Sequence, residues 1–600
     1  MPSRRASAGK GGAPHVRVVG AGISGMTAAL RLLQRGYSVT IYEDKDRVGG
    51  NLAGFDEGGV QYDVYPHLFG EWYHNFWKLV EGDLKLTRGD SGGTSFEPRY
   101  TFKVLDRGRF PNYIDLLNVK SPGKNLFSGL ASPADMFLWA YSAIDGLSYS
   151  DVDDDALDRI SVDGFLRTRP YTTAEVSTLH DSIVMTIWSL HSDQTSAAAY
   201  RRFVEHNVPL PNPLAWLLTG NLGTKLMQPL QRKIEALGGV FKMQTRVSEV
   251  VVAGSNGQGA TARVEAVKTR ATTYDKKSGR QAVGKTMTTV LGPSDSIILA
   301  VSPAALGNLV THGAEGKRIV DRLQTLSEVR RLTAEPIPVL NLYFNRKLPN
   351  IPKENILLRD SLYDLTVLDL EQLWHDDPMM SKNGKRRTVL CVAASDYYAL
   401  PSDNEDQQKQ HILHELRKYI PFDDDDVDKD CTYFDTNTDD KLFLNVVGGR
   451  QWQPESHYPK AIANLFFAGD CTINPVRMAT VESAVVSGLQ AARGIWQAAP
   501  LGPPIELQVT DALPLPLVVA LKSWLAPWAF AAKCWSNMTT DVLPALADGT
   551  PTRVQSAMTE AAIDLWATPY LMAADVWRSI VRAAACGPTA FGSGPDQASR

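Results

Sequence analysis

Residues 16–51, VRVVGAGISGMTAALRLLQRGYSVTIYEDKDRVGGN, decide the fold of this chain. A short β-branched run at 16–19 predicts a strand, and apolar residues at helical spacing over 26–34 predict a helix. Three glycines occupy the turn between them: Gly20, Gly22 and Gly25. In a dinucleotide-binding turn the first glycine permits the tight turn, the second lets a pyrophosphate approach the backbone, and the third allows helix and strand to pack closely. The segment therefore predicts a Rossmann-like turn whose helix N-terminus holds phosphates.

An acidic residue stands where such a turn needs one. Glu43 follows a second predicted strand at 38–42 and lies 18 residues after Gly25. A carboxylate at this point accepts hydrogen bonds from the hydroxyl groups of an adenosine ribose, which favours an unphosphorylated ribose. Glycine turns also occur in loops that bind nothing, but here strand, helix and acid all stand at the required places. We therefore expect a dinucleotide cofactor.

A second glycine pair distinguishes between the cofactors. The segment 46–51, DRVGGN, places Arg47, Gly49 and Gly50 directly after the acid, and a nicotinamide enzyme has no need of this pair. The segment resembles the one with which flavoproteins of the amine oxidase and phytoene desaturase superfamily wrap their cofactor. The resemblance implies FAD, with Arg47 and both glycines in contact with it.

The far end of the chain carries a second match to this superfamily. Residues 464–470, NLFFAGD, and 479–492, ATVESAVVSGLQAA, resemble its C-terminal flavin signature. The pattern indicates a buried strand, a turn that ends in a carboxylate, and a helix packed through small residues. By resemblance, Asp470, preceded by Gly469, hydrogen-bonds the ribityl chain, and backbone amides near Val481 face the flavin pyrimidine carbonyl at a helix N-terminus.

A third segment completes the expected cofactor domain. Residues 223–239 show the apolar spacing of an amphipathic helix that ends in glycine. Val247 lies in the strand that follows, and by resemblance its main chain meets the adenine. Residues 295–303, DSIILAVSP, resemble the family's strand and turn. The polar, strand-like stretch 254–293 predicts an elongated hairpin.

Three local stretches resemble the carotenoid desaturase branch of the superfamily. Residues 65–80, 338–348 and 478–488 are similar to segments of plant-type phytoene and zeta-carotene desaturases. The resemblance puts His67 beside the isoalloxazine ring as the candidate catalytic group, and a packed core histidine is the alternative interpretation. Ser483 departs from the family, which usually has glycine there, so we expect a reshaped pocket floor.

The fold class that follows is α/β. A Rossmann-like FAD-binding domain of the GR2, amine oxidase-like type is interleaved with an α+β substrate domain, and a helical C-terminal extension follows. The expected parts are a disordered leader at 1–14, the FAD-binding domain at 15–95, 223–305 and 440–500, the substrate-binding domain at 96–222 and 306–439, and the extension at 501–600. A chain of 600 residues is long enough for several domains.

The charge and cysteine content of the chain indicate which partners and which cellular location to expect. The 62 basic and 66 acidic side chains are spread along the sequence, so we expect no nucleic-acid partner. Five widely spaced cysteines indicate a reducing, cytoplasmic location. The spacing suggests no metal site, and no Ser/His/Asp constellation is apparent. Two acidic runs, 151–155 and 423–426, lie near expected helix starts and are interpreted as solvated.

The extension is rich in tryptophan. Residues 501–600 hold five of the 13 tryptophans, within apolar helical stretches. The longest apolar stretch, 517–532, is interrupted by Lys522 and Pro527 and is shorter than the roughly 20 residues that span a bilayer. Three interpretations stay open: a helix pair that lies on lipid as a peripheral membrane contact, a layer that shields the core, and a self-association face of a homo-oligomer.

The expected chemistry follows from the cofactor. A flavin accepts hydride, so the protein mainly has to hold a substrate C–H bond over the ring and exclude water. We expect hydride removal from an apolar, isoprenoid or polyene-like small molecule, which forms or relocates a C=C bond in the manner of a desaturase or isomerase. A flavin amine oxidase and a catalytically degenerate flavin-binding scaffold are the alternatives. The electron acceptor stays open between oxygen and a quinone.

Overall fold

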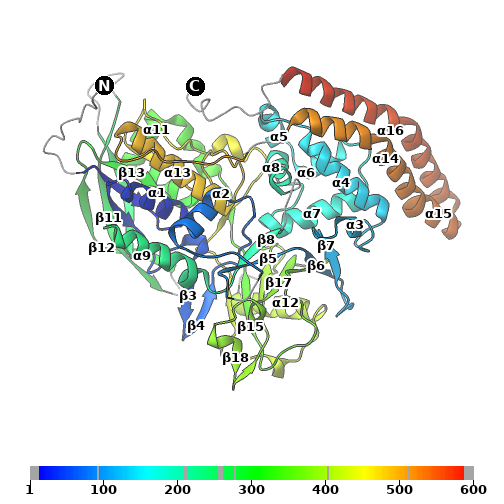
Figure 1. Ribbon diagram of the computed structural model, residues 1–600, viewed down its shortest axis with the longest axis horizontal. Coiled ribbons are helices and arrows are strands. Elements are labelled where there is room, and N and C mark those ends of the chain that lie inside the picture. Colours follow the sequence, from blue (N-terminus) through cyan, green and yellow to red (C-terminus); the bar gives the residue numbers. More distant parts are fainter. Residues whose placement is uncertain are drawn as a thin grey trace.

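The computed structural model describes residues 13–90, 93–207, 213–253, 261–275, 279–401, 404–510 and 513–586. Most of the expected leader, residues 1–12, lies outside them. The described chain forms a body with two main sheets and, at the opposite end from a long β-ribbon, a projecting pair of helices (Figure 1).

A five-stranded parallel sheet is built from segments far apart in the sequence. Its order is β23 (Leu465–Phe467), β13 (Ser296–Leu299), β1 (His15–Val19), β2 (Ser38–Tyr42) and β9 (Val240–Lys242), with every neighbouring pair parallel. The strands expected at 16–19 and 38–42 are confirmed. The expected helix after the glycine turn is α1 (Ile23–Leu33). Helices connect parallel strands because the chain must return to the same end of the sheet.

Both faces of this sheet are buried, which explains its continuous apolar strands. Alternate residues such as Val18 and Ile41 face α1 and α13 (Val481–Ala498) in one core. The residues between them, such as Val19 and Leu299, share a second core with β10 (Thr245–Val252) and with the helices that follow β13. The sheet therefore lies between two apolar layers, and its strand ends are the accessible edge at which the glycine turn sits.

The elongated hairpin expected within 254–293 is confirmed. β11 (Val264–Asp275) and β12 (Gly279–Val290) pair in antiparallel register and extend from β10. Helices α10 (Pro303–Thr311) and α11 (Gly313–Arg322) pack beside β10. These two helices share the core of the parallel sheet, although the expected bounds put α11 and most of α10 in the substrate domain. The domain bounds as a whole stay a prediction.

A seven-stranded mixed sheet forms the other large layer. Its order is β21 (Tyr433–Asp435), β15 (Val339–Tyr343), β20 (Val389–Ala394), β17 (Leu365–Asp369), β16 (Ile356–Leu358), β6 (Phe102–Leu105) and β7 (Ile114–Leu116). Only the β16–β6 pair is parallel. The sheet thus joins residues 102–116 to residues 339–435. Helix α12 (Glu405–Arg417) covers one face of it.

Residues 106–221, within the expected substrate domain, are mainly helical. The longer helices are α4 (Pro133–Leu147), α7 (Ala174–Trp188) and α8 (Ala197–Asn207). The acidic run at 151–155 does begin a helix, as expected, but its interpretation as solvated is wrong for Asp154. That side chain is buried and forms ion pairs with Arg201, Arg202 and Arg477. The sequence of several adjacent aspartates does not show which of them forms ion pairs with arginines that lie far away in the chain.

The C-terminal extension is helical, as expected. Helix α14 (Leu515–Asn537) packs on α4, and α16 (Pro551–Cys586) returns antiparallel along α14, with the short α15 (Leu543–Asp548) at the turn (Figure 1). Among the described residues, one helical stretch, 515–548, has the length and apolar composition of a membrane span.

Candidate functional site

Two glycines of the opening turn are required by packing within the protein. Gly20 has a φ of +102°, and a Cβ there would lie 2.1 Å from the carbonyl oxygen of Ala300 at the end of β13. A Cβ on Gly25 would lie 2.2 Å from the carbonyl oxygen of Gly20. Both distances are far below a van der Waals contact, so any larger residue would separate the strands or lift α1 from the turn.

Gly22 has a different environment. A Cβ on this residue would meet only the carbonyl oxygen of Gly49, at 3.9 Å. Packing therefore does not require a glycine here, and the open side lies at the N-terminus of α1, where backbone N–H groups attract phosphate. This arrangement fits a pyrophosphate that approaches the main chain.

The second glycine pair lies against the first turn. The Gly49 N–H donates to the carbonyl oxygen of Ala21 at 2.9 Å, and Gly49 has a φ of +122°. Arg47 lies beside this pair, over the ring of Phe55 at 4.9 Å, and 3.6 Å from a carboxylate oxygen of Asp440. Its Nε is buried without a hydrogen-bond partner among the described residues. An unused donor next to the glycine pair fits an anionic ligand. Contact of Arg47, Gly49 and Gly50 with the cofactor remains a prediction.

Glu43 directs its carboxylate into the turn. Its Oε2 accepts a hydrogen bond from the Ala21 N–H at 2.7 Å, and its Oε1 accepts one from the Lys45 N–H at 3.0 Å. Burial raises the pKa of Glu43 to about 7; the Ala21 N–H opposes this shift and the neighbouring Asp44 adds to it. The carboxylate lies at the carboxyl end of β2, where the ribose hydroxyls are expected. That role remains a prediction.

Val247 lies at an irregular point in its strand. The pairing of β10 with β11 runs regularly to Val247 and Thr269 and then shifts register before Glu249. Such a bulge leaves main-chain groups outside the ladder. The expected contact between the Val247 main chain and an adenine is compatible with this local geometry.

The C-terminal signature reaches the same region from the other side of α1. Gly469, with a φ of +130°, follows β23, and its N–H donates to the Ser487 hydroxyl at 2.8 Å. The Ser487 hydroxyl also lies 3.0 Å from that of Ser24 on α1. A Cβ on Gly488 would lie 2.2 Å from the Ser24 carbonyl oxygen. Small residues thus bring α13 against α1 and join segments more than 460 residues apart.

Asp470 follows this turn and keeps part of its surface accessible. Burial raises its pKa to about 6, and backbone N–H groups oppose the shift. Val481 is the first residue of α13, and the Thr480 hydroxyl caps this helix by accepting from the Ser483 N–H at 3.1 Å. Helix N-terminus and carboxylate therefore lie on one short loop. The expected contacts of Gly469, Asp470 and Val481 with the flavin remain predictions.

Glu482 was not anticipated as a site residue. Its Oε1 accepts from the Asn75 N–H at 2.9 Å and its Oε2 from the Phe76 N–H at 2.9 Å. The carboxylate therefore caps helix α2 (His74–Trp77), which follows the segment that contains His67. The signal that the sequence offers for such a role is a single acidic residue within a run of small residues. Its partners, more than 400 residues away, could not be identified from the sequence.

Ser483, the departure from the family, is buried and does not leave an unpaired hydroxyl. Its Oγ accepts from the Asn474 side-chain amide at 2.8 Å. The extra polar group, in the first turn of α13, is therefore satisfied within the protein by a residue of the loop that precedes this helix.

His67 is partly buried between Tyr65 and Phe69. Its Nδ1 lies 3.0 Å from the Tyr65 carbonyl oxygen. A carbonyl can only accept, so Nδ1 carries the proton and Nε2 presents a lone pair. Burial lowers the pKa of His67 to about 4, so the imidazole is neutral at neutral pH. Its expected place beside the flavin ring remains a prediction.

One group of described residues, His191 with Asp364 and Asp396, has side chains close enough to hold a metal ion. Hydrogen bonds to Asp181 and Asp396 raise the pKa of His191 to about 10. The two ring nitrogens of His191 each lie 3.3 Å from a carboxylate oxygen, one of Asp181 and one of Asp396, so the imidazolium cation forms ion pairs with both.

The comparisons with known proteins agree with this arrangement. A profile of the family described as flavin containing amine oxidoreductase matches residues 23–496. The 15-cis-phytoene desaturase of Synechococcus elongatus is 22% identical over 499 residues, which cover 80% of this chain and 95% of that protein. The zeta-carotene desaturase of Arabidopsis thaliana is 24% identical over 255 residues, which cover 40% of this chain and 45% of that protein. The structure of wild-type putrescine oxidase bound to putrescine aligns with a TM-score of 0.56 at 16% identity, over 81% of this chain and 99% of that one.

Proposed function

The chain belongs to the family of flavin-containing amine oxidoreductases and is an FAD-dependent oxidoreductase, and within this family we propose that it desaturates or isomerises an apolar, polyene-like substrate. The substrate loses a hydride from one carbon and a proton from the neighbouring carbon, and a C=C bond forms between them. An isomerase would return the hydride at another position.

The observation that supports this choice is the composition of the loop before α13. Residues 470–480, which connect β23 to α13, contain no Phe, Tyr or Trp. Amine oxidases of this superfamily usually form an aromatic cage at this place, and aromatic faces attract amines and their cations. Without such rings, the loop offers an amine no comparable recognition.

The candidate catalytic segment also suits an uncharged substrate. His67 is neutral, and its neighbours Tyr65 and Phe69 are buried aromatic residues. Burial of an amine cation beside these groups would cost desolvation energy without a counter-charge. Two of the similar proteins are named as desaturases of phytoene and zeta-carotene, which supports a substrate of the polyene class.

Bound FAD supplies the hydride acceptor for this reaction. The open side of Gly22 and the unused Nε of Arg47 would hold its pyrophosphate, and Glu43 would hold its adenosine ribose. Asp470 would hold its ribityl chain. The Nε2 lone pair of His67 would accept the proton that the neighbouring substrate carbon releases. The surrounding aromatic side chains exclude water from that proton.

Anaerobic mixing of the purified holoenzyme with candidate polyenes and amines tests the proposal. We expect polyenes to bleach the visible absorption of oxidised flavin if the enzyme is a desaturase, and amines to leave it unchanged. An isomerase returns the hydride, so it would convert the polyene without lasting bleaching. Bleaching by amines alone would identify an amine oxidase, and neither bleaching nor conversion of a polyene would support a non-catalytic flavin-binding scaffold. Addition of oxygen or a quinone after bleaching then identifies the acceptor that restores the band.

A further inference from the structure

Helix α14 presents an apolar stripe to solvent. Its exposed large side chains recur at helical spacing along the whole helix and to the residue that follows it: Leu517, Leu521, Trp524, Trp528, Trp535 and then Met538. Their exposed fractions range from 43% to 68%. The other exposed residues of α14 are two alanines and two prolines, so no charged side chain interrupts the stripe.

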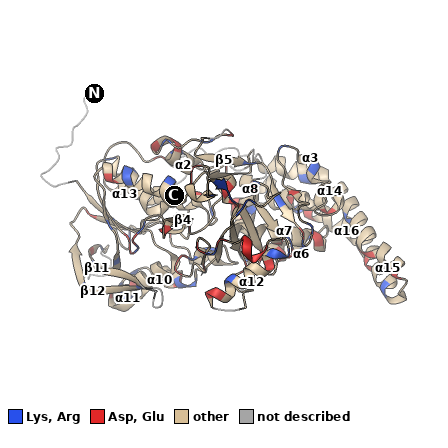
Figure 2. Ribbon diagram, turned by 90° about the horizontal axis from the view of Figure 1, so that it is seen from below, with Lys and Arg blue, Asp and Glu red and all other residues tan. Residues whose placement is uncertain are grey.

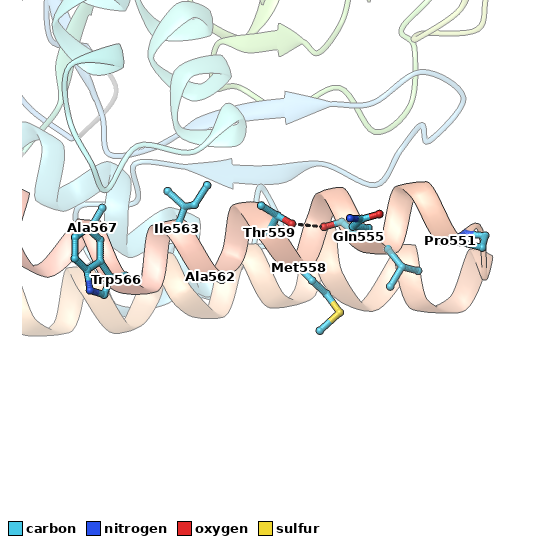
Figure 3. Close-up of a pocket in the computed structure, with 9 residues that line it drawn as sticks. Pro551, Gln555, Met558, Thr559, Ala562, Ile563, Trp566 and Ala567 are labelled. Carbon is cyan, nitrogen blue, oxygen red and sulfur yellow. Dashed lines mark hydrogen bonds between the residues drawn. The ribbon is translucent and has the colours of Figure 1, made fainter.

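Helix α16 extends this apolar surface. A shallow groove of about 980 Å³ runs along it from Pro551 to Ala567, and Figure 3 shows Met558, Ile563 and Trp566 projecting from the helix there. Further along, Tyr570 and Trp577 are exposed by 69% and 65%. Contiguous exposed apolar surface of this extent is typical of an interaction site and unusual for a face in contact with water.

The polarity of this helix pair is reversed relative to an ordinary surface helix. Lys522, in the first half of α14, is fully buried, and its Nζ lies 2.5 Å from a carboxylate oxygen of Asp145 and 2.6 Å from one of Asp575. Asp145 belongs to α4 and Asp575 to α16. These three charges thus lie inside and the tryptophans outside, and Figure 2 shows mostly uncharged ribbon along α14 and α16. Such an arrangement is stable where the surroundings are apolar.

The buried ion pairs also determine how the helices can meet a membrane. α14 has the length and composition of a span, but Lys522 ties it to α4, and Ser536 donates to the carboxylate of Asp135 on the same helix at 2.8 Å. A crossing would break these contacts and place a lysine in the bilayer core. The helix can therefore enter the membrane only with its outer face.

A second copy of the chain fits this surface less well than lipid does. The exposed apolar residues of α16 include the neighbours Ile563, Leu565 and Trp566, which point in different directions around the helix. A rigid partner covers one flat face, whereas fluid lipid covers a convex surface. Tryptophan and tyrosine also favour the interface between headgroups and acyl chains.

We propose that α14 and α16 form a monotopic lipid-docking surface that lies flat in one leaflet of a bilayer. The described part of this hairpin, residues 515–585, carries five basic and five acidic side chains. Attachment is therefore driven by burial of apolar side chains, and anionic lipid contributes little. This inference concerns only the extension, beyond the family match that ends at residue 496, and it does not depend on the proposed substrate.

Co-sedimentation of the full-length holoenzyme with phosphatidylcholine vesicles tests this surface. We expect binding that changes less than about twofold between low and high salt, or on addition of phosphatidylglycerol. The triple variant Trp524→Ser/Trp528→Ser/Trp535→Ser should lower the partition coefficient at least about a hundredfold, because each exposed tryptophan loses its apolar burial. Its matched control is Met287→Ser/Val290→Ser/Tyr398→Ser, which changes three exposed apolar residues outside the extension. Two of them belong to β12, which lies at the opposite end of the molecule in Figure 1, and this variant should bind as the wild type does.

Three results would overturn the proposal. The triple variant could bind vesicles as the wild type does. The lipid-free wild type could be a dimer by light scattering that the triple variant splits, with neither protein binding vesicles. Lipids brominated near the chain ends could quench tryptophan fluorescence more strongly than lipids brominated near the headgroup, which would indicate a span. Retained flavin absorbance in both triple variants shows that the fold is intact.

Discussion

Substitution of Gly488 by alanine tests the junction on which the cofactor site depends. In α13 an alanine Cβ at this position would lie 2.2 Å from the Ser24 carbonyl oxygen of α1, where ordinary contact begins at 3.4 Å. The obstacle is backbone within a helix, so no side chain can turn away to make room. The two helices must separate by about 1 Å or tilt.

The expected cost combines three effects. Overpacking of a buried contact costs about 1–3 kcal/mol. Separation of the helices also breaks the Ser24–Ser487 hydrogen bond, which contributes about 1 kcal/mol. Against this, alanine in a helix interior stabilises the helix by about 1 kcal/mol relative to glycine. We therefore expect Gly488→Ala to destabilise the folded protein by about 2 kcal/mol and to weaken FAD binding, since the N-termini of α1 and α13 are both expected to face the cofactor.

The matched control is Gly146→Ala on α4. A Cβ at Gly146 meets no atom within 4 Å, so helix propensity alone should act and stabilise the protein by up to about 1 kcal/mol. Thermal unfolding of both variants and the fluorescence of released FAD measure the two effects. If Gly488→Ala unfolds at the wild-type temperature and retains FAD equally, α1 and α13 do not cross as described, and the reasoning fails.

Three further predictions concern buried ionisable groups. Burial raises the pKa of Glu43 to about 7, so between pH 4.5 and 7 the folded apoprotein holds a proton that the unfolded chain has released. The free energy of unfolding should therefore fall by up to about 3 kcal/mol as the pH rises from 4.5 to 7. Glu43→Gln should flatten that pH dependence in thermal melts of the apoprotein and weaken FAD affinity roughly tenfold or more; an unchanged slope would contradict this account. Lys522→Met should cost about 3–5 kcal/mol by leaving Asp145 and Asp575 undercompensated, seen as faster hydrogen exchange in α14 and α16. The less buried Lys533→Met should cost less than about 1 kcal/mol, and equal effects of the two lysine variants would argue against the buried triad. His67→Gln should lower kcat/KM about a hundredfold. We expect the wild type to lose activity as pH falls towards 4, where the His67 imidazole becomes protonated, and the variant should lack this loss; a wild-type rate would remove His67 from the mechanism.

Short-range patterns in the sequence determined the flavin fold. The strands at 16–19 and 38–42, the helix between them and the hairpin within 254–293 are confirmed because each depends on residue spacing along a few turns or strand pairs. The family and its FAD cofactor were likewise predictable, since glycine turns and small-residue helices tolerate few alternatives.

Which buried charges meet is known only from the folded chain. These contacts join residues that are hundreds of positions apart in the sequence. Glu482 contacts Asn75 across 407 positions, Asp154 pairs with Arg477, and Lys522 is enclosed between Asp145 and Asp575. No local spacing records such pairs, because an aspartate or lysine has the same sequence neighbours whether it faces water or a counter-ion. Its energy depends on desolvation and on the charge that the fold brings beside it, and these are properties of the packed structure. For the same reason, only the structure showed that the tryptophans of the extension face outward.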